Sequence, residues 1–409
     1  MHILGLYSFI VLYGVTAKAT QDKICLLGPF GPSKESICAD PAIPHDFDAS
    51  KQLPITHDEN EEPTGAPPAW GEPENCVNET CIFANNEIAG GMVLLTNRYY
   101  AEKVKSFPSV SESDSATPPP FCLEEVPGKG IGLVANRTIH KGEIIMVRSP
   151  TLVAHSGLLT RMEKGARDAF YDSAMGILPT ARREEFMSQM GEGVHGKIET
   201  YCFQLYVDGG KKGSSHLGCY PEISRFNHDC RPNVHYRLNN ITHTTVAVRD
   251  IAPGEELSIS YIDLLLSHAD RTKRLSKWGF QCSCAQCTVG ANETAASDAR
   301  LRRIAQLKAD LETFDRTVVT AETGAELVAL YRAERLDSYL GHAHTRAALN
   351  FALFGDEARA REHAAAAADA VEREAGPGAA DAAAMRLLAE NPRAHWTWGK
   401  RRKDGKKKS

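Results

Sequence analysis

The sequence predicts an α+β fold, made of several small β-sheets with a helical insert and followed by an α-helical region. Three observations indicate this fold. Short strand-like runs follow one another without the regular alternation of strand and helix that builds a parallel sheet. Residues 158–190 carry apolar side chains at about every fourth position, which indicates a helical insert. From Asp298 onward the chain is rich in alanine and keeps a helical spacing of its apolar residues.

The strand-like runs share apolar or aromatic side chains and neighbouring turn residues, and they lie within 128–135, 143–147, 201–207, 234–238 and 244–248. In the helical region, residues 346–354 and 358–371 predict an antiparallel helix pair, since Gly355 separates them. The pattern is similar to stacked helix hairpins, although no fixed period repeats.

Composition and charge bound the possible functions. The 409 residues correspond to two or three domains. A formal net charge of -5 excludes a generic polyanion binder, but the charge is uneven. Residues 20–120 are rich in acidic residues and proline, so we expect a stretch of low order with little core. Residues 396–409 are basic and predict a solvated tail.

The N-terminus predicts a secretory signal peptide over residues 1–19. An apolar run from Ile3 to Val15 ends near Ala17-Lys18-Ala19, a small-x-small cleavage pattern. A buried N-terminal helix or an incorrectly assigned start would also account for the run. Asn-x-Thr sequons at Asn78, Asn136, Asn240 and Asn292 fit a secreted chain. No segment is long and apolar enough to predict a membrane span.

Eight of the eleven cysteines fall into two groups with different chemistry. Cys25 and Cys38, and likewise Cys76 and Cys81, could each close a small disulfide loop, although pairing cannot be deduced from sequence. Cys282, Cys284 and Cys287 are too close in sequence for good disulfides among themselves. Three such thiolates suit one tetrahedral Zn²⁺, and Cys230 is the best candidate for the fourth ligand. Disulfides or buried free thiols are the alternative interpretation.

Three motifs occur in one order along the chain. A Gly-x-Gly turn lies at 128–132, the run Asn227-His228-Asp229-Cys230-Arg231-Pro232-Asn233 follows, and Gly254-Glu255-Glu256 leads to Tyr261. Each motif alone has an ordinary structural reading, as a turn or a core aromatic. Together, and ahead of the cysteine triplet, they resemble the SET-domain lysine methyltransferases from about Phe121 to Cys287. The run 259–265, Phe280 and the helical region are similar to the SET-and-MYND subfamily.

The MYND zinc finger is absent from the resemblance, because residues 158–195, where it would lie, contain no cysteine. The resemblance is therefore to a fungal-type SET protein that lacks the finger. It implies a SET-type fold with a helical insert and a zinc-bound post-SET segment. The implied organisation begins with a signal peptide at 1–19 and a low-order region at 20–120. The SET domain follows at 121–262, with its insert at about 158–195, and then the post-SET zinc segment at 263–290. A helical region at 291–395 and a basic tail at 396–409 complete the chain.

The resemblance also implies the cofactors and the site residues. S-adenosylmethionine (SAM) would be the methyl donor, and one structural Zn²⁺ would be held by the four cysteines. Tyr261 would be the catalytic residue. The residues implied to contact SAM are Lys129, Gly130, Ile131, Asn227, His228, Tyr261 and Phe280. Phe203 or Tyr201 would line the channel for the substrate lysine, although both also fit a core role.

Some positions differ from the family pattern. Asp229 stands where the family pattern has a serine, and a hydrogen bond from its side chain within the local turn would make this replacement harmless. Ile131 stands where relatives carry a larger polar or aromatic residue, and Ser258 and Ser260 replace more common threonine and aspartate. Because Asn227, His228 and Tyr261 remain, we expect a functional cofactor site.

The function expected from the resemblance is SAM-dependent methylation of a lysine ε-amine in a histone or other protein. A SET scaffold without activity that acts as a protein-binding module is the alternative. We expect a monomer with no direct nucleic-acid motif. The N-terminus favours the secretory pathway, whereas the resemblance favours the nucleus or cytosol.

Overall fold

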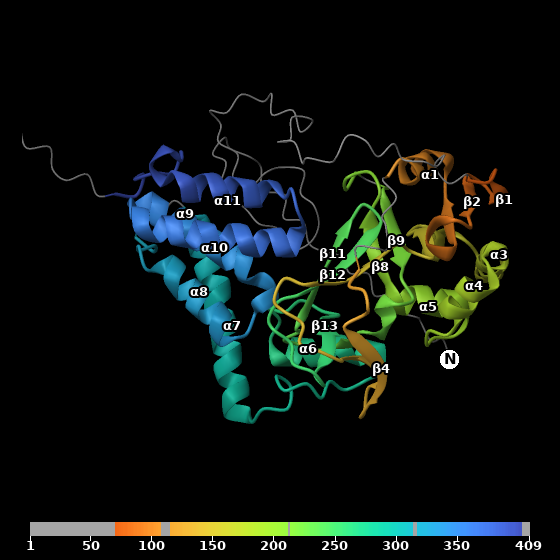
Figure 1. The fold of residues 1–409 in the computed structure, drawn as a ribbon, viewed down its shortest axis with the longest axis horizontal. Helices are drawn as coiled ribbons and strands as arrows, with labels where there is room; N and C mark the ends of the chain where they lie inside the picture. The colour runs from red at the N-terminus through yellow and green to blue at the C-terminus, as the bar shows by residue number, and fades with distance from the viewer. Residues whose placement is uncertain (1–69, 108–114, 212, 314–316, 403–409) are drawn as a thin grey trace, which may run out of the picture.

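The computed structural model describes residues 70–107, 115–211, 213–313 and 317–402, and it confirms the α+β fold (Figure 1). Within these residues the strands form three small sheets, and most of the helices gather into two groups. In Figure 1 the sheets occupy the centre and right of the view, and helices α7 to α11 lie on the left. The predicted signal peptide and the Cys25 and Cys38 loop lie outside the described residues.

The largest sheet has six strands and begins far ahead of the predicted SET domain. Its order is β1 (Glu74–Val77), β2 (Thr80–Asn85), β3 (Met92–Thr96), β7 (Leu152–His155), β9 (Ser215–Cys219) and β8 (Cys202–Tyr206). Disulfides join Cys76 to Cys81 and Cys202 to Cys219, and the sequence did not indicate the second.

The expectation of low order over 20–120 is wrong for residues 74–105. All five side chains of β3 are buried, and β3 pairs in parallel with β7. Helix α1 (Arg98–Lys105) follows, and its cap residue Asn97 accepts a hydrogen bond from the backbone of Tyr100. A five-residue strand buried on both faces carries no alternating pattern, so the acidic and proline-rich surroundings concealed it.

Two smaller sheets carry the sequence motifs. One has the order β10 (Asn227–His228), β13 (Glu256–Ile259), β5 (Gly130–Ala135) and β4 (Phe121–Val126). The other contains β11 (Val234–Asn239), β12 (Thr242–Ala247) and β6 (Ile144–Arg148). Strand β10 pairs in parallel with β13, so the Asn-His pair lies beside the strand that leads to Tyr261. The fold therefore brings segments more than 90 residues apart into one sheet.

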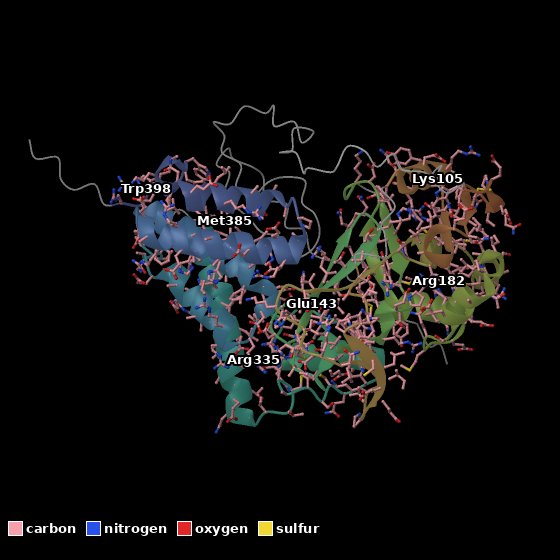
Figure 2. The ribbon with its side chains drawn as sticks, in the orientation of Figure 1. Lys105, Glu143, Arg182, Arg335, Met385 and Trp398 are labelled. Carbon is pink, nitrogen blue, oxygen red and sulfur yellow. A yellow bond between two sulfur atoms is a disulfide. The ribbon has the colours of Figure 1, made fainter. Side chains whose placement is uncertain are left out.

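The helical insert lies where the sequence predicted it and extends slightly further. It consists of α2 (Leu158–Arg161), α3 (Lys164–Ile177), α4 (Thr180–Met187) and α5 (Gly193–Tyr201). Its apolar face packs on the six-stranded sheet, where Phe170, Tyr171 and Phe186 contact a core shared with Val93 and Leu152. Figure 2 shows Arg182 on this side of the molecule, away from Met385 and Trp398 in the helical region.

The C-terminal region is a stack of helices, as predicted. After α6 (His268–Leu275) it contains α7 (Ala291–Glu312), α8 (Thr323–Ala333), α9 (Leu340–Phe354), α10 (Glu357–Ala375) and α11 (Ala380–Glu390). Fully buried alanines such as Ala347 and Ala364 lie in its core, which lets the helices approach closely. Gly324 is an example, since a Cβ there would lie 2.7 Å from the Ala347 Cα.

The expectation of a solvated basic tail is wrong for its first residues. Arg401 is only 4% exposed, and its backbone N–H donates to the Leu353 carbonyl over 2.8 Å. Its guanidinium also donates to the Thr313 carbonyl. The aromatic and polar residues before it, including Thr397, pack on α9, so the tail is anchored up to this point. Lys403 to Lys408 lie outside the described residues. No helix of the described chain has the length and apolar character to cross a membrane.

Candidate cofactor and metal site

A polar network at the candidate site joins β10, β13 and the turn before β5. The Asn227 amide on β10 donates to Glu256 Oε1 over 2.9 Å, and Lys129 Nζ lies 2.5 Å from Glu256 Oε2. Glu256 therefore links the turn before β5 to the Asn-His pair. Gly132 lies beneath this network, since a Cβ there would stand 2.8 Å from Asn227 Nδ2. The structure thus brings Lys129 and Asn227 together through a residue whose role the sequence did not indicate.

His228 is buried and fully engaged within the protein. Its Nδ1 accepts the backbone N–H of Tyr261 over 3.0 Å, so the ring proton belongs on Nε2. Nε2 lies 3.2 Å from Cys230 Sγ. Burial lowers the pKa of His228 to about 4, which agrees with a neutral ring. Because both ring nitrogens are occupied, the side chain positions Tyr261 and Cys230, and only the main chain of His228 remains for a cofactor.

Tyr261 is held at both ends. Its backbone N–H binds His228, and its hydroxyl donates to the Phe226 carbonyl over 2.7 Å. The ring is half-buried, with Trp278 at 6.0 Å and Phe280 at 6.4 Å between ring centroids. Burial is the main cause that raises the pKa of Tyr261 well above its ordinary value, so the hydroxyl stays protonated.

An open turn and two exposed apolar side chains lie beside these polar groups. Gly128 and Gly130 have φ values of +74° and +77°, and nothing lies within 4 Å of a Cβ at either position. Ile131 is 49% exposed and Phe280 is 37% exposed. Exposed main chain, an amide, an ammonium, a carboxylate and an aromatic ring form a donor set that fits SAM, which carries an adenine, a carboxylate and cationic groups.

The four predicted cysteines form one cluster. The Sγ atoms of Cys230, Cys282, Cys284 and Cys287 all lie within 4.8 Å of one another, and those of Cys230 and Cys287 are 3.5 Å apart. A tetrahedral zinc with Zn–S bonds near 2.3 Å requires sulfur atoms about 3.8 Å apart. Cys230 comes from the motif after β10, and the other three come from the loop after α6. The arrangement could hold a zinc ion that joins the two segments.

Arg231, the residue after the first cysteine, connects the site to the helical region. Its guanidinium bonds to the Glu334 carboxylate at 2.6 Å, and both side chains are 1% exposed. The same guanidinium donates to the Cys230 and Leu264 carbonyls over 2.7 and 3.2 Å. Glu334 also accepts hydrogen bonds from Ser297 and Arg300 on α7. Sequence reasoning missed this joint, because the two partners are 103 residues apart.

The remaining motif positions serve mainly to fix the backbone. Asn233 Oδ1 accepts the Ser258 N–H over 2.9 Å, and its amide donates to the Glu256 carbonyl over 2.8 Å. Asp229 makes a local turn bond to the Arg231 N–H at 2.7 Å. Phe203 packs against Tyr220, Tyr236 and His243, with centroid distances between 4.6 and 5.9 Å, which is an aromatic core environment.

Comparison with known proteins gives a consistent result. Residues 130–262 match the SET domain model. The chain is 32% identical over 203 residues to histone-lysine N-methyltransferase set5 of Schizosaccharomyces pombe, covering 47% of this chain and 56% of that protein. It is 35% identical over 105 residues to N-lysine methyltransferase SMYD2-B of Danio rerio, and the match covers 25% of this chain and 24% of that protein. It is 43% identical over 72 residues to histone-lysine N-methyltransferase SMYD3 of Homo sapiens, covering 17% of each. The chain thus spans about half the length of the first relative and a quarter or less of the others.

Proposed function

Because residues 130–262 form a SET domain, and because the chain is similar to lysine methyltransferases, we propose that it transfers a methyl group from SAM to a lysine of a protein substrate. The observation that carries the proposal is the meeting of Asn227, His228 and Tyr261 beside an open glycine turn. The names of the relatives favour a histone or another protein as the substrate.

The proposed chemistry depends on positioning. SAM supplies a methyl group that its sulfonium has already activated, so the protein must align the reacting amine and exclude water. Lys129, Asn227 and Glu256 would hold the polar parts of the cofactor, and Phe280 would cover its adenine. The glycine turn leaves main chain accessible for close approach.

The substrate lysine must react as a neutral amine, although the pKa of a free lysine is about 10.4. Burial in apolar surroundings lowers the pKa of an amine, and so does a nearby positive charge. Tyr261 and its neighbours Trp278 and Phe280 would provide such surroundings. The protonated hydroxyl of Tyr261 would orient the amine, because its oxygen keeps lone pairs while its proton is held by Phe226.

The zinc that we propose for the four cysteines would be structural. It would fix the loop that carries Phe280 against the segment that carries Asn227 and His228, so that both sides of the cofactor site keep their spacing. The chemistry itself would need no metal, since the donor is activated by its own charge.

Two measurements on the full chain test the proposal. Calorimetry should detect SAM binding, and labelled methyl groups should appear on core histones or on proteins of a mixed panel. Asn227→Ala should weaken SAM binding, because it removes the amide held by Glu256. Asn239→Ala, at the exposed end of β11, is the matched control and should bind SAM normally. SAM binding without transfer to any protein would favour the inactive SET scaffold instead.

A further inference from the structure

Arg225 directly precedes the residue that binds the hydroxyl of Tyr261. It ends a short turn of 3-10 helix (Ile223–Arg225), and the next residue, Phe226, accepts the Tyr261 hydroxyl. Its guanidinium reaches the insert, where Nη2 donates to the Ser188 hydroxyl over 2.7 Å, just after the end of α4. The residue directly before the acceptor of the Tyr261 hydroxyl therefore carries a permanent positive charge, which extends from there toward the insert.

The nearby carboxylates are already paired with other arginines. Glu222 lies 2.8 Å from Arg182 and 3.5 Å from Arg148, and Arg182 also binds Glu185 at 2.7 Å. Among the described residues, no carboxylate lies within ion-pair distance of Arg225, whose side chain is half-exposed. A guanidinium has five N–H donors in a fork that matches a carboxylate, and the bond to Ser188 uses only one.

Tyr201 and Met190 extend the surface around this charge. Tyr201 ends α5, is half-buried and takes a hydrogen bond from the Met190 backbone. Burial raises the pKa of Tyr201, and the positive charge of Arg225 opposes that rise. Met190 is 75% exposed and Met187 is 43% exposed. Hydrogen bonds thus join Arg225 to Ser188, and Tyr201 to Met190 two residues further along, and we call these four residues the rim.

We propose that the rim selects substrates with an acidic side chain within one or two positions of the target lysine, and that Arg225 binds this carboxylate. This inference rests on the proposed function and narrows its substrate class. An apolar side chain of the same segment would lie against Met190, whose flexible thioether adapts to different partners. Because the contact forms equally with bound substrate and in the transition state, it should lower KM more than it raises kcat.

The test uses three lysine peptides that differ only in the residue next to the lysine, which is Glu, Gln or Lys. With the full-length protein, kcat/KM should fall in that order, by about three- to tenfold from Glu to Lys, mostly through KM. Arg225→Gln should remove the preference, and Arg225→Glu should reverse it. Arg302→Gln is the control, since Arg302 is an exposed arginine on α7, and it should keep the wild-type preference.

The outcomes separate this inference from the proposed function. Equal kcat/KM for the three peptides in the wild type, or an unchanged preference in Arg225→Glu, would overturn the role of Arg225 while methyl transfer stands. A wild type that methylates no peptide and no protein would overturn the proposed function, and this inference with it. Circular dichroism and SAM binding of the Arg225 variants establish that they are folded.

Discussion

At the scale of single residues, Tyr261 has a fixed ring and a hydroxyl proton that is already donated to a backbone carbonyl. The backbone bond to His228 fixes the main chain, and the bond to the Phe226 carbonyl fixes the hydroxyl. The oxygen then offers its lone pairs in one direction. This geometry accounts for how one tyrosine could orient an amine without acting as a base.

The hydroxyl of Tyr261 is therefore the first target for mutation. Tyr261→Phe keeps the ring and removes the oxygen, so SAM affinity should change little while turnover falls by about 10²-fold. Stopped assays of methyl transfer, paired with calorimetry of SAM binding, measure the two effects separately. Tyr99→Phe is the control. Tyr99 lies on α1, its exposed hydroxyl donates to Asp208, and its removal should leave turnover normal. Equal turnover in Tyr261→Phe and wild type would remove this hydroxyl from the mechanism.

The sequence indicated the motif residues but not their bonds. Asn227 and Tyr261 could be proposed because the order of the motifs resembles a family. The link from Lys129 through Glu256 could not, since Lys129 and Glu256 are 127 residues apart and depend on how three strands pair. Arg225 lies two residues before the Asn-His motif, and the sequence could not show that its charge lacks a carboxylate partner, which follows only from the bond between Glu222 and Arg182.

At the scale of elements, the loop after α6 depends on the cysteine cluster. The loop holds Phe280 and three of the four cysteines, and few regular hydrogen bonds support it. Leu275 and Trp278 pack around the cluster and complete a small core. Such a segment needs a metal or a disulfide to keep one structure, because its apolar core is small.

We predict one zinc per chain, which can be measured by elemental analysis of the purified protein. Cys284→Ser should lose the metal and, because binding is coupled to folding, should also lose hydrogen-exchange protection over residues 263–290. Cys122→Ser is the matched control, since Cys122 is a free cysteine on β4 outside the cluster, and it should retain the zinc. A zinc-free wild type, or full zinc content in Cys284→Ser, would contradict the assignment.

The elements that sequence reasoning missed are those with short or interrupted patterns. Strands β1 to β3 lie in a stretch whose average composition predicts low order, and only tertiary pairing with β7 makes β3 a central strand. The long helices were easier to predict from the sequence, because α9 and α10 repeat their apolar positions over several turns and a glycine separates them.

At the scale of the whole molecule, the Arg231 and Glu334 pair joins the two halves of the described chain. It lies between the cysteine motif and the end of α8, with Ser297 and Arg300 completing its hydrogen bonds. Buried pairs of this kind are costly to break, because the remaining partner keeps an uncompensated charge. The helical region is thus tied to the candidate site and is more than an appended module.

Glu334→Gln should destabilise the protein by about 3 kcal/mol at neutral pH, as measured by urea unfolding. Burial tends to raise the pKa of Glu334, but the bonds from Arg231, Ser297 and Arg300 outweigh it and hold the pKa below its ordinary value. Its contribution is therefore present above about pH 4.3 and is lost as the pH falls further. The difference between variant and wild type should shrink in acid. Glu326→Gln breaks an exposed pair between Glu326 on α8 and Arg303 on α7, and it should change stability by less than about 1 kcal/mol.

We also propose that the protein enters the secretory pathway, on the strength of the N-terminal apolar run and its small-x-small pattern. N-terminal sequencing of the mature protein from a eukaryotic host should then give a start after about Ala19. An intact Met1 would instead favour the nucleus or cytosol, where the SAM pool is expected.

The central claim is that this chain methylates lysine, and tandem mass spectrometry of the reaction products tests it most directly. The full-length protein, SAM and a mixed protein panel, with core histones included, should give peptides that carry added methyl groups on lysine side chains. Samples without SAM, and samples with Tyr261→Phe, should show few or none. Methylation absent from every lysine, or equally present with Tyr261→Phe, would contradict the account.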